Sequence, residues 1–289
     1  MTTASTMNIL SVQSAVAFGH VGNSAAVFPL QRLGFEVWPV NTVAFSNHPG
    51  YGSWRGRICP AELVAELLAG LAEHGVLGSC SAVLSGYLGT VESGIAMLDA
   101  VMQIKRANPD ALYCCDPVIG DRASGAYVRP GLAAFFRDRA LAEADLATPN
   151  HFELEQLTER RIASLADAIL AADALRKTGP GIVLVTSLER SDAPAETSEM
   201  LVVEGDKAWL VTTPLLPIAI NGAGDALAAL FLGHYLLTRN AEQALAAAAA
   251  AVFSIIEATW KAGSRELQLI AAQDDFVAPR RRFAPLRVR

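Results

Sequence analysis

Short apolar runs rich in β-branched residues alternate along this chain with longer segments of helical periodicity. This alternation is typical of βαβ units, in which parallel strands form a sheet and the connecting helices cover both of its faces. The predicted strands comprise residues 8–14, 35–48, 81–88, 111–118, 144–150 and 181–188, and an antiparallel pair follows at 199–215. The predicted helices lie within 19–34 after a loop, and at 60–73, 90–107, 130–139, 151–159, 164–178, 223–238 and 241–260. The fold class is therefore α/β, with a mostly parallel central sheet flanked by helices.

No segment has the composition of a linker between independent domains, and the sequence contains no internal repeat. We therefore expect one domain over residues 1–289, with tails at 1–7 and 278–289. Pro39 lies within a predicted strand and places part of it at a sheet edge or a bulge, because proline cannot donate to a central ladder. The turn-rich segment PGYGSWRGR at 49–57 predicts a small flap over a site.

The charge balance argues against a general nucleic-acid binder, because the net charge is −6 and such proteins normally carry a basic surface. Five arginines fall in the last ten residues, and we interpret them as a solvated tail: Arg280, Arg281, Arg282, Arg287 and Arg289.

The cysteines and the apolar stretches bear on location. The four cysteines show no CxxC spacing, which fits a reducing compartment and argues against structural zinc. The N-terminus MTTASTM has no features of a secretory signal. The longest apolar stretch, residues 244–256, is shorter than the roughly 20 residues that a membrane span needs. We therefore expect a cytoplasmic protein without a membrane or nucleic-acid partner.

Small and polar residues gather where each predicted strand ends. They include Ser14 and the segments 85–89, 116–121, 148–155 and 186–187. Ligands of open α/β sheets bind outside the carboxyl ends of the strands, so these positions predict a binding site at one edge of the sheet.

The segment NGAGD at 221–225 precedes a long apolar helix. Asp225 could cap that helix, because a carboxylate near a helix start satisfies free backbone N–H groups. Alternatively, Gly222 and Gly224 leave the helix start bare so that an anion can approach it, with Asp225 facing what binds there. The segment alone leaves both interpretations open.

Two further carboxylates lie at predicted strand ends. Asp116 could start a turn before Pro117, or it could face a ligand or a hydrated Mg²⁺ ion. Glu153 stands three residues after Asn150, where it could complete a capping box or act as a second, outer-sphere carboxylate for the metal. Neither residue is specific by itself.

Several other patterns are weak or missing. The loop Gly19–Asn23 is a possible ligand cradle or a plain helix entry, and His20 and His48 lack the spacing of metal ligands. Neither GxxxxGK[ST] nor a GxGxxG after the first strand is present, and no nucleophile motif surrounds Ser85, Tyr87 or Ser187. The pattern favours anion and metal binding over covalent catalysis.

In combination, these segments resemble the pyridoxal kinases of the ribokinase-like superfamily over nearly the whole chain. The segments that carry the resemblance are ILSVQS, GHVGNSAAVFPLQRLGFEVWPVNTV, FSNHPGYG, LSGYLG, CDPVIGD, TPNHFELE, VTS and NGAGD, in the order of the family. The resemblance implies a three-layer α-β-α fold with a flap and a homodimer. It also implies transfer of the ATP γ-phosphate to the 5′-hydroxyl of pyridoxal with Mg²⁺, and a monovalent cation as a possible further requirement.

The resemblance also assigns roles to individual positions. Asp225 matches the catalytic acid–base residue, and Gly222, Ala223 and Gly224 match the anion hole. The positions near the metal and phosphates are Asp116, Asp121 and Glu153; those that contact ATP are Tyr127, Thr148, Asn150, Thr186 and Ser187; those near the adenine are Thr213, Pro214, Leu215 and Leu216. Ser14, Val43 and Tyr87 match positions that line the pyridine ring, and Pro49 stands where the flap touches it.

The departures from the family pattern fall on the substrate side. Ala15 replaces a frequent histidine, Ala44 a glutamine, Pro49 a threonine and Ala126 the cysteine of some bacterial relatives. The preferred form of vitamin B6 therefore stays open. A kinase for another hydroxymethyl heterocycle, such as hydroxymethylpyrimidine, and a non-catalytic B6-binding protein are the alternatives, whereas the missing GxGxxG argues against an oxidoreductase.

Overall fold

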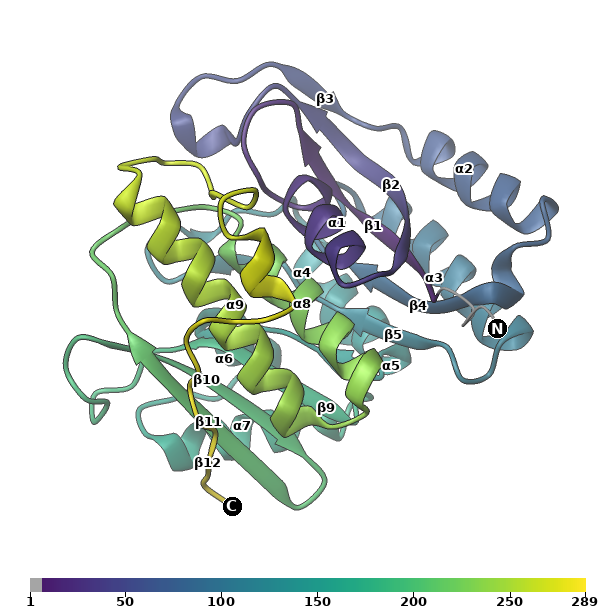
Figure 1. The fold of residues 1–289 in the computed structure, drawn as a ribbon. Coiled ribbons are helices and arrows are strands. Elements are labelled where there is room, and N and C mark those ends of the chain that lie inside the picture. Colours follow the sequence, from purple (N-terminus) through teal and green to yellow (C-terminus); the bar gives the residue numbers. More distant parts are fainter. Residues whose placement is uncertain (1–6) are drawn as a thin grey trace, which may run out of the picture.

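A large twisted sheet runs through the centre of the protein in the computed structural model, which describes residues 7–289 (Figure 1). Within those residues the sheet has ten strands in the order β12-β11-β10-β9-β8-β5-β4-β1-β2-β3. The strands are β1 (Asn8–Val16), β2 (Glu36–Phe45), β3 (Gly56–Ile58), β4 (Cys80–Ser85), β5 (Leu112–Cys115), β8 (Leu146–Ala147), β9 (Ile182–Leu188), β10 (Thr197–Glu204), β11 (Lys207–Pro214) and β12 (Leu286–Arg287). A separate hairpin consists of β6 (Gly120–Asp121) and β7 (Gly125–Ala126).

The strands from β2 to β9 pair in parallel, whereas β3 and β10 to β12 pair antiparallel. The mostly parallel α/β sheet and the antiparallel pair that the sequence predicts are thus confirmed. The chain order reverses between β1 and β4, which places a topological switch point at the carboxyl ends of these two strands.

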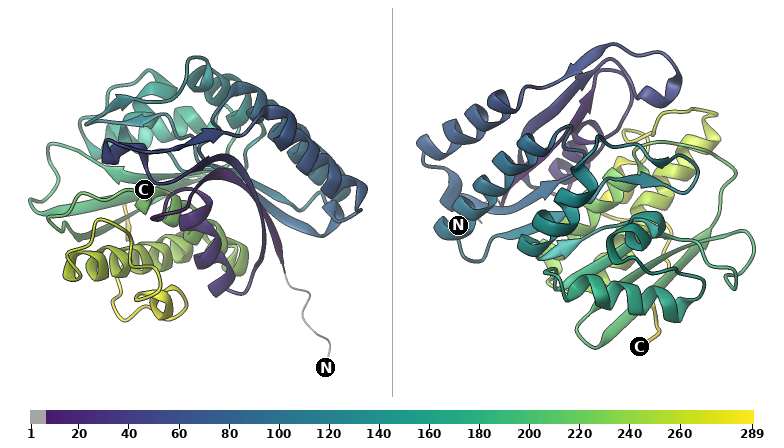
Figure 2. Two further views of the ribbon diagram at one scale, coloured as in Figure 1. Left: turned by 90° about the horizontal axis from the view of Figure 1, so that it is seen from above. Right: turned by 180° about the vertical axis from the view of Figure 1, so that it is seen from behind.

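Helices cover both faces of the sheet and give three layers (Figure 2). One face carries α1 (Asn23–Arg32), α8 (Ala223–Thr238) and α9 (Ala241–Lys261). The other carries α2 (Ala61–Glu73), α3 (Val91–Ala107), α4 (Leu132–Phe135), α5 (Leu141–Glu143), α6 (His151–Thr158) and α7 (Leu165–Arg176). A π-helical segment, Phe136–Ala140, joins α4 to α5.

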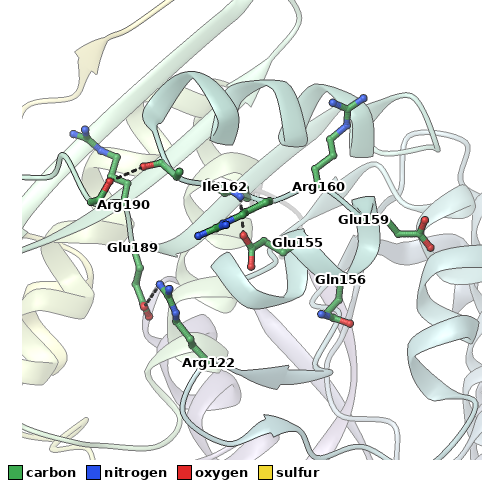
Figure 3. Close-up of a pocket in the computed structure, with 11 residues that line it drawn as sticks. Arg122, Glu155, Gln156, Glu159, Arg160, Ile162, Glu189 and Arg190 are labelled. Carbon is green, nitrogen blue, oxygen red and sulfur yellow. Dashed lines mark hydrogen bonds and ion pairs between the residues drawn. The ribbon is translucent and has the colours of Figure 1, made fainter.

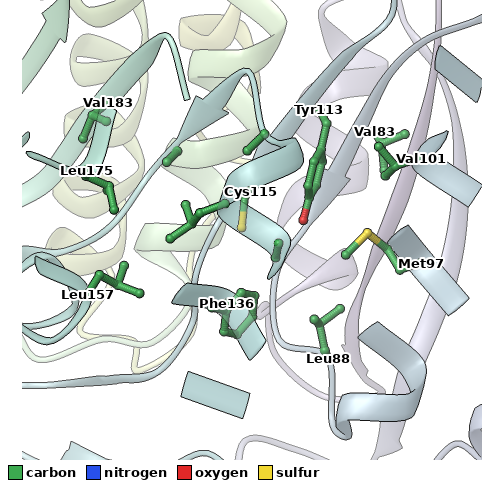
Figure 4. Packing of buried hydrophobic residues seen from close by; sticks show 14 of the residues in the cluster. Val83, Leu88, Met97, Val101, Tyr113, Cys115, Phe136, Leu157, Leu175 and Val183 are labelled. Atoms are coloured by element: carbon green, nitrogen blue, oxygen red, sulfur yellow. The ribbon is translucent and has the colours of Figure 1, made fainter. Parts of the chain in front are cut away.

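Alternation along the strands divides the core between the two faces. In β5, Tyr113 and Cys115 pack with the α3 and α6 side, whereas Cys114 packs with the α8 side. Figure 4 shows the first cluster, in which Tyr113 and Cys115 lie among Met97 and Phe136. Successive strand residues point to opposite faces, so both faces of a buried sheet need apolar side chains, and the continuous apolar runs of the sequence follow from this.

Four of the observed strands, β2, β4, β5 and β8, are shorter than the predicted ones at their carboxyl ends, whereas β1 runs two residues further and β9 ends as predicted. The predicted strands at 111–118 and 144–150 end at Cys115 and Ala147. Each is followed within two or three residues by a proline, which has no N–H for the ladder. The polar residues there leave the sheet and become available to a site.

Pro39 lies in the middle of β2 and pairs with Ser11 of β1. On its other side β2 pairs with β3 only over Val43–Phe45, so Pro39 is at an open edge, as predicted. The flap predicted at 49–57 is the connection between β2 and β3. It begins with a short 3-10 helix at Pro49–Tyr51.

Helix α9 corrects one expectation about the apolar stretch at 244–256. The helix has 21 residues and is long and apolar enough to cross a membrane by length and composition. However, 61% of its most apolar window is buried inside the protein, against α8 and the sheet. We therefore interpret it as a core helix.

The C-terminal segment differs from the predicted solvated tail at 278–289. Strand β12 extends the sheet beside β11, and Arg289 forms an ion pair with Asp173. Arg280 forms an ion pair with Asp275, and Arg281 forms one with Glu257. These contacts depend on the tertiary fold, so the sequence alone could not predict them. Of the predicted N-terminal tail, residues 1–6 lie outside the described residues, and Met7 packs against the core.

Candidate active site

A cavity of about 520 Å³ opens at the switch point of the sheet. Its walls come from the ends of β1 and β2, the loop after β4, the β6–β7 hairpin and the start of α8. The lining residues are Ser14, Val16, Val21, Val43, Phe45, His48, Pro49, Gly50, Tyr87, Val118, Asp121, Ser124, Tyr127, Asn221, Gly222 and Asp225. The structure thus brings together predicted residues that lie more than two hundred positions apart in the chain.

The start of α8 forms one wall of the cavity. Gly222 is the N-cap residue, with a φ of 85°, and no side chain caps the helix. Asp225 stands in the first turn, and no side chain caps the helix start among the described residues, so the structure does not support the capping interpretation; the nearby Gly22 N–H instead lowers the pKa of the Asp225 carboxyl group. The free N–H groups of the first turn therefore remain available to an anion.

The surroundings of Asp225 change its acidity. Removal of the carboxyl group from water raises its pKa to about 6, and the hydrogen bond from Gly22 only partly offsets this effect. At neutral pH the side chain is ionised, but it is a stronger base than an exposed aspartate.

Two glycines permit the close packing around this helix start. A Cβ atom on Gly222 would lie 1.8 Å from the carbonyl oxygen of His20, and one on Gly22 would lie 2.2 Å from that of Ser14. Gly224 is different, since a Cβ atom there would have no neighbour within 4 Å. Gly222 and Gly22 are thus needed for packing, whereas Gly224 leaves open space at the helix start for a ligand.

Two more carboxyl groups lie behind Asp225. Asp116 follows β5 and is buried, and its Oδ1 accepts a hydrogen bond of 3.1 Å from the Thr148 hydroxyl. Burial raises the pKa of Asp116 well above its usual value, and the negative charges of Glu153 and Asp225 raise it further. Three carboxyl groups in one buried region therefore favour the approach of a cation or a proton.

Glu153 has a structural role at the start of α6. Its Oε2 accepts from the Asn150 N–H at 2.9 Å, and the Asn150 side chain accepts from the Glu153 N–H, so the predicted capping box is present. Its Oε1 accepts from the N–H groups of Ile119 and Gly120. Glu153 thereby holds the chain that leads from Asp116 into the β6–β7 hairpin.

The donor set around Asp116 fits a hydrated divalent cation that also binds phosphate. Among residues 7–289, no three His, Cys, Asp or Glu side chains are arranged to hold a metal by themselves. Asp116 and Glu153 offer hard oxygen atoms, but backbone donors already engage both Glu153 oxygens. Mg²⁺ is commonly held by one or two carboxylates together with substrate phosphates and waters, which is the arrangement that these residues allow.

The predicted substrate-side residues lie together. Ser14, Val43, Pro49 and Tyr87 all line the cavity. The loop that carries Tyr87 is fixed to β2, because the Thr42 hydroxyl donates to the Tyr87 carbonyl oxygen at 2.6 Å. Burial raises the pKa of the Tyr87 hydroxyl, which therefore stays protonated and can donate a hydrogen bond.

Most of the residues that depart from the family pattern on the substrate side do not line the cavity. Ala15 and Ala44 are direct neighbours across the β1–β2 pair, and neither lines the cavity. Their side chains alternate with those of Ser14 and Val43, which do line it. Ala126 is exposed on β7, so Pro49 is the departure that borders the cavity.

The predicted ATP contacts divide into two groups. Asp121 and Tyr127 line the cavity, and the Asn150 side chain donates to the Gly120 carbonyl oxygen behind the same hairpin. The others do not line the cavity: Thr148 follows β8, Thr186 and Ser187 lie at the end of β9, Thr213 and Pro214 on β11, and Leu215 and Leu216 beyond it. The structure does not bring this second group into the cavity wall.

Eight lining residues were not predicted. Val16 and Phe45 stand two positions after Ser14 and Val43, so strand alternation could have found them. His48, which lacks the spacing of a metal ligand, accepts at Nδ1 from the Gly50 N–H at 3.2 Å and also lines the cavity. The remaining ones are Val21, Gly50, Val118, Ser124 and Asn221. All of them except Ser124 lie in segments that the sequence indicates, the loop 19–23, the flap 49–57, the segment 116–121 and NGAGD, although no pattern singles out the individual residue.

A larger hollow, of about 690 Å³, lies apart from this site near the end of α6 (Figure 3). Arg122 and Glu189 point toward each other across it, with 3.2 Å between their charged atoms. Glu155 accepts from the Ile162 N–H at 2.7 Å, and Arg190 pairs with Glu199 at 2.6 Å. Arg160 and Arg161 also line the hollow, whereas none of the predicted site residues does.

Comparisons with known proteins agree with the geometry of the first cavity. Residues 60–269 match the family model of phosphomethylpyrimidine kinase. The chain is 58% identical to pyridoxal kinase PdxY from Rubrobacter xylanophilus over 98% of both chains. It is 53% identical to pyridoxal kinase PdxY from Deinococcus radiodurans, with 97% of this chain and 96% of the relative covered.

Solved structures give the same result. Pyridoxal kinase from Leishmania donovani in complex with ADP and pyridoxamine superposes with a TM-score of 0.91 at 30% identity, over 98% of this chain and 99% of that one. A phosphomethylpyrimidine kinase fold from Bacteroides thetaiotaomicron superposes with a TM-score of 0.90 at 22% identity, which supports the fold alone. With its three-layer ribokinase-like fold and its close relatives over nearly the full length, the chain belongs to the pyridoxal kinase family.

Proposed function

We infer that the chain is an ATP-dependent kinase that transfers the γ-phosphate to the 5′-hydroxyl of pyridoxal, forming pyridoxal 5′-phosphate. Relatives at 45–58% identity over nearly the whole chain are pyridoxal kinases. The observation that carries the inference to this site is the uncapped start of α8, which opens into a cavity beside Asp225.

Phosphoryl transfer depends on in-line positioning and on neutralisation of the charge that develops on the γ-phosphoryl group. The N–H groups of residues 222–225 would supply fixed positive potential at the helix start, without any reorganisation during the reaction. The open space beside Gly224 supports this placement of the phosphate.

The acceptor would bind in the half of the cavity that Ser14, Val43 and Tyr87 line. Its hydroxyl would then face Asp225, which would accept the proton. Val43 and Phe45 offer apolar contact to an aromatic ring, and the Ser14 and Tyr87 hydroxyls offer hydrogen bonds to ring substituents.

We propose that Mg²⁺ accompanies ATP and would be held by Asp116 directly and by Glu153 through water. When bound, the ion would supply charge neutralisation at the phosphate oxygens. We further propose, from the resemblance, that Thr186, Ser187 and residues 213–216 border the nucleotide, that the protein is a homodimer and that it is cytoplasmic.

A substrate panel tests the function. Purified protein is assayed for ATP-dependent phosphorylation of pyridoxal, pyridoxamine, pyridoxine and hydroxymethylpyrimidine. We expect pyridoxal to have the highest kcat/KM, because the relatives are pyridoxal kinases. Higher kcat/KM for hydroxymethylpyrimidine would assign the chain to the other branch of its family, and pyridoxal phosphate binding without ATP turnover would show a non-catalytic B6-binding protein.

The acidity of Asp225 predicts a pH dependence. A general base must be deprotonated, and the pKa of Asp225 is about 6, so kcat/KM for pyridoxal should fall roughly tenfold per pH unit below about pH 6. Above that pH the rate should be flat. The measurement is a pH–rate profile of the wild type beside Asp225→Asn, in which the residual rate should lack this acid limb. An identical limb in both proteins would assign the titration to another group.

A further inference from the structure

The flap between β2 and β3 is held together by its own hydrogen bonds. The Asn47 side chain donates to the Ser53 carbonyl oxygen at 2.8 Å, and the Arg55 N–H donates to the Ser46 hydroxyl at 2.8 Å. His48, Pro49 and Gly50 of this flap line the cavity. The position of the whole flap therefore determines how the acceptor half of the cavity is covered.

Tyr51, the next residue, joins the flap to a distant part of the chain. Its hydroxyl donates to Oε1 of Glu266, in the loop after α9. The guanidinium carbon of Arg265 lies 4.4 Å from the centre of the Tyr51 ring, which adds a cation–π contact. These contacts span 215 positions of sequence, and Figure 1 shows the loop after α9 reaching toward the flap.

Glu266 also contacts the loop that precedes α1. Its Oε2 accepts from the His20 N–H at 3.0 Å. The carboxylate fits there because residue 19 is glycine, since a Cβ atom on Gly19 would lie 2.1 Å from Oε2. The His20 carbonyl oxygen in turn faces Gly222 at the start of α8, so one carboxylate connects the flap with the loop that borders the proposed phosphate site.

The backbone of Glu266 is fixed. Its N–H donates to the Ser264 hydroxyl at 3.0 Å, and its carbonyl oxygen accepts from the Gln268 side chain at 3.0 Å. Leu267 is fully buried in the core beside Gly222. Glu266 is thus a fixed point to which the flap is tied through Tyr51.

We propose that Glu266 is a positioning residue that, through Tyr51, holds the flap over the acceptor half of the active site. The proposal rests on the proposed function, because it assumes that the acceptor binds beneath His48, Pro49 and Gly50. Loss of the Tyr51–Glu266 bond leaves the flap attached only through β2, β3 and the Arg265 contact. Acceptor binding then weakens, whereas ATP binding is little affected, because the flap borders only the acceptor half.

The test is a double-mutant cycle on Tyr51→Phe and Glu266→Gln. Tyr51→Phe removes only the hydroxyl and keeps the ring beneath Arg265. Glu266→Gln keeps the size, and its amide oxygen can still accept from the His20 N–H. It removes the charge, so the charge-assisted bond that the Tyr51 hydroxyl donates is lost and at most a neutral contact with the amide N–H replaces it. We expect each variant to raise the KM and the Kd for pyridoxal about 10- to 150-fold, the range for a lost hydrogen bond to a charged group, with the ATP KM within twofold of wild type.

The double variant should be little worse than the poorer single variant, because both changes break the same bond. Tyr235→Phe and Glu257→Gln are the matched controls: Tyr235 stacks on Phe231 within α8, and Glu257 pairs with Lys261 and Arg281, away from the cavity. Thermal melting of every variant shows whether the fold is retained.

Pyridoxal Kd and KM within twofold of wild type in both single variants would overturn the proposal. Equal losses of affinity for pyridoxal and for ATP, together with a lower Tm, would also overturn the proposal, because they indicate a general structural role of the residue. Wild-type turnover of pyridoxal is measured in the same series. Its absence would refute the proposed function, whereas the ratio of pyridoxal Kd values, which needs no turnover, would still decide the role of Glu266.

Discussion

Asp225→Asn is expected to bind ATP as the wild type does and to lose about 10²–10⁴-fold in kcat, the usual contribution of a general base. The asparagine keeps the size of the side chain and still presents an oxygen to the Gly22 N–H that lowers the pKa of Asp225. It cannot take up the proton of the acceptor hydroxyl. The measurement is steady-state kinetics with pyridoxal together with equilibrium titration of ATP.

The acidities restrict how the proton is transferred. The pKa of an alcohol lies far above that of any carboxyl group, about as high as that of water, whereas the pKa of Asp225 is about 6. Burial thus brings the pKa of the base closer to that of the alcohol than the pKa of about 3.9 of an exposed aspartate. Full deprotonation of the alcohol before the reaction nevertheless stays strongly unfavourable. The proton must therefore leave as the new O–P bond forms.

The same variant should be more stable than the wild type. The pKa of Asp225 is raised from its unfolded value near 3.9 to about 6, so the folded state binds more protons between these values and loses stability as the pH rises through them. At pH 7 the ionised Asp225 carboxylate lowers the free energy of unfolding by up to about 3 kcal/mol. The neutral asparagine does not carry this cost. Asp99→Asn, at an exposed position on α3, is the matched control and should change neither property. Turnover of Asp225→Asn within fivefold of wild type would remove Asp225 as the base.

Gly222→Ala is expected to lower the free energy of unfolding by about 3–5 kcal/mol. Two effects combine: the residue has a φ of 85°, which disfavours a side chain, and the new Cβ atom would lie 1.8 Å from the His20 carbonyl oxygen. Gly75→Ala separates them, because Gly75 has a φ of 78° but no neighbour within 4 Å of a Cβ atom. That control should lose only about 1 kcal/mol in urea unfolding.

Gly224→Val tests the ligand side of the same helix start. Since a Cβ atom on Gly224 meets nothing within 4 Å, the variant should fold with nearly normal stability. If the phosphate of ATP occupies this space, the valine should reduce kcat/KM for ATP by about 100-fold or more, as misplacement of reacting groups does. Unchanged kinetics would show that the space beside Gly224 is not used by the nucleotide.

The sheet and its covering helices could be predicted from the sequence because the signals are local. Successive side chains of β5 point to opposite faces of the sheet, so Tyr113 and Cys115 belong to one core and Cys114 to the other. Strands buried on both faces appear in the sequence as continuous apolar runs. The long apolar helices that became α8 and α9 were found nearly to the residue. The predicted ends of the strands were less accurate, because contacts within the site determine which residues leave the sheet.

The site was partly predictable for the same reason. Asp225, Tyr87 and Ser14 belong to motifs within single segments, and all of them line one cavity. Glu266 carried no signal, since its importance depends on Tyr51 and His20, which lie more than two hundred positions away. Likewise, the ion pair of Arg289 with Asp173 depends on tertiary packing that no local pattern reveals.

A crystal structure with a non-hydrolysable ATP analogue and pyridoxal is the most direct measurement of the central claim. The terminal phosphate is predicted to contact the backbone N–H groups of residues 222–225, with the acceptor hydroxyl beside the Asp225 carboxylate. A triphosphate bound away from the start of α8, with Asp225 contacting neither ligand, would contradict the account.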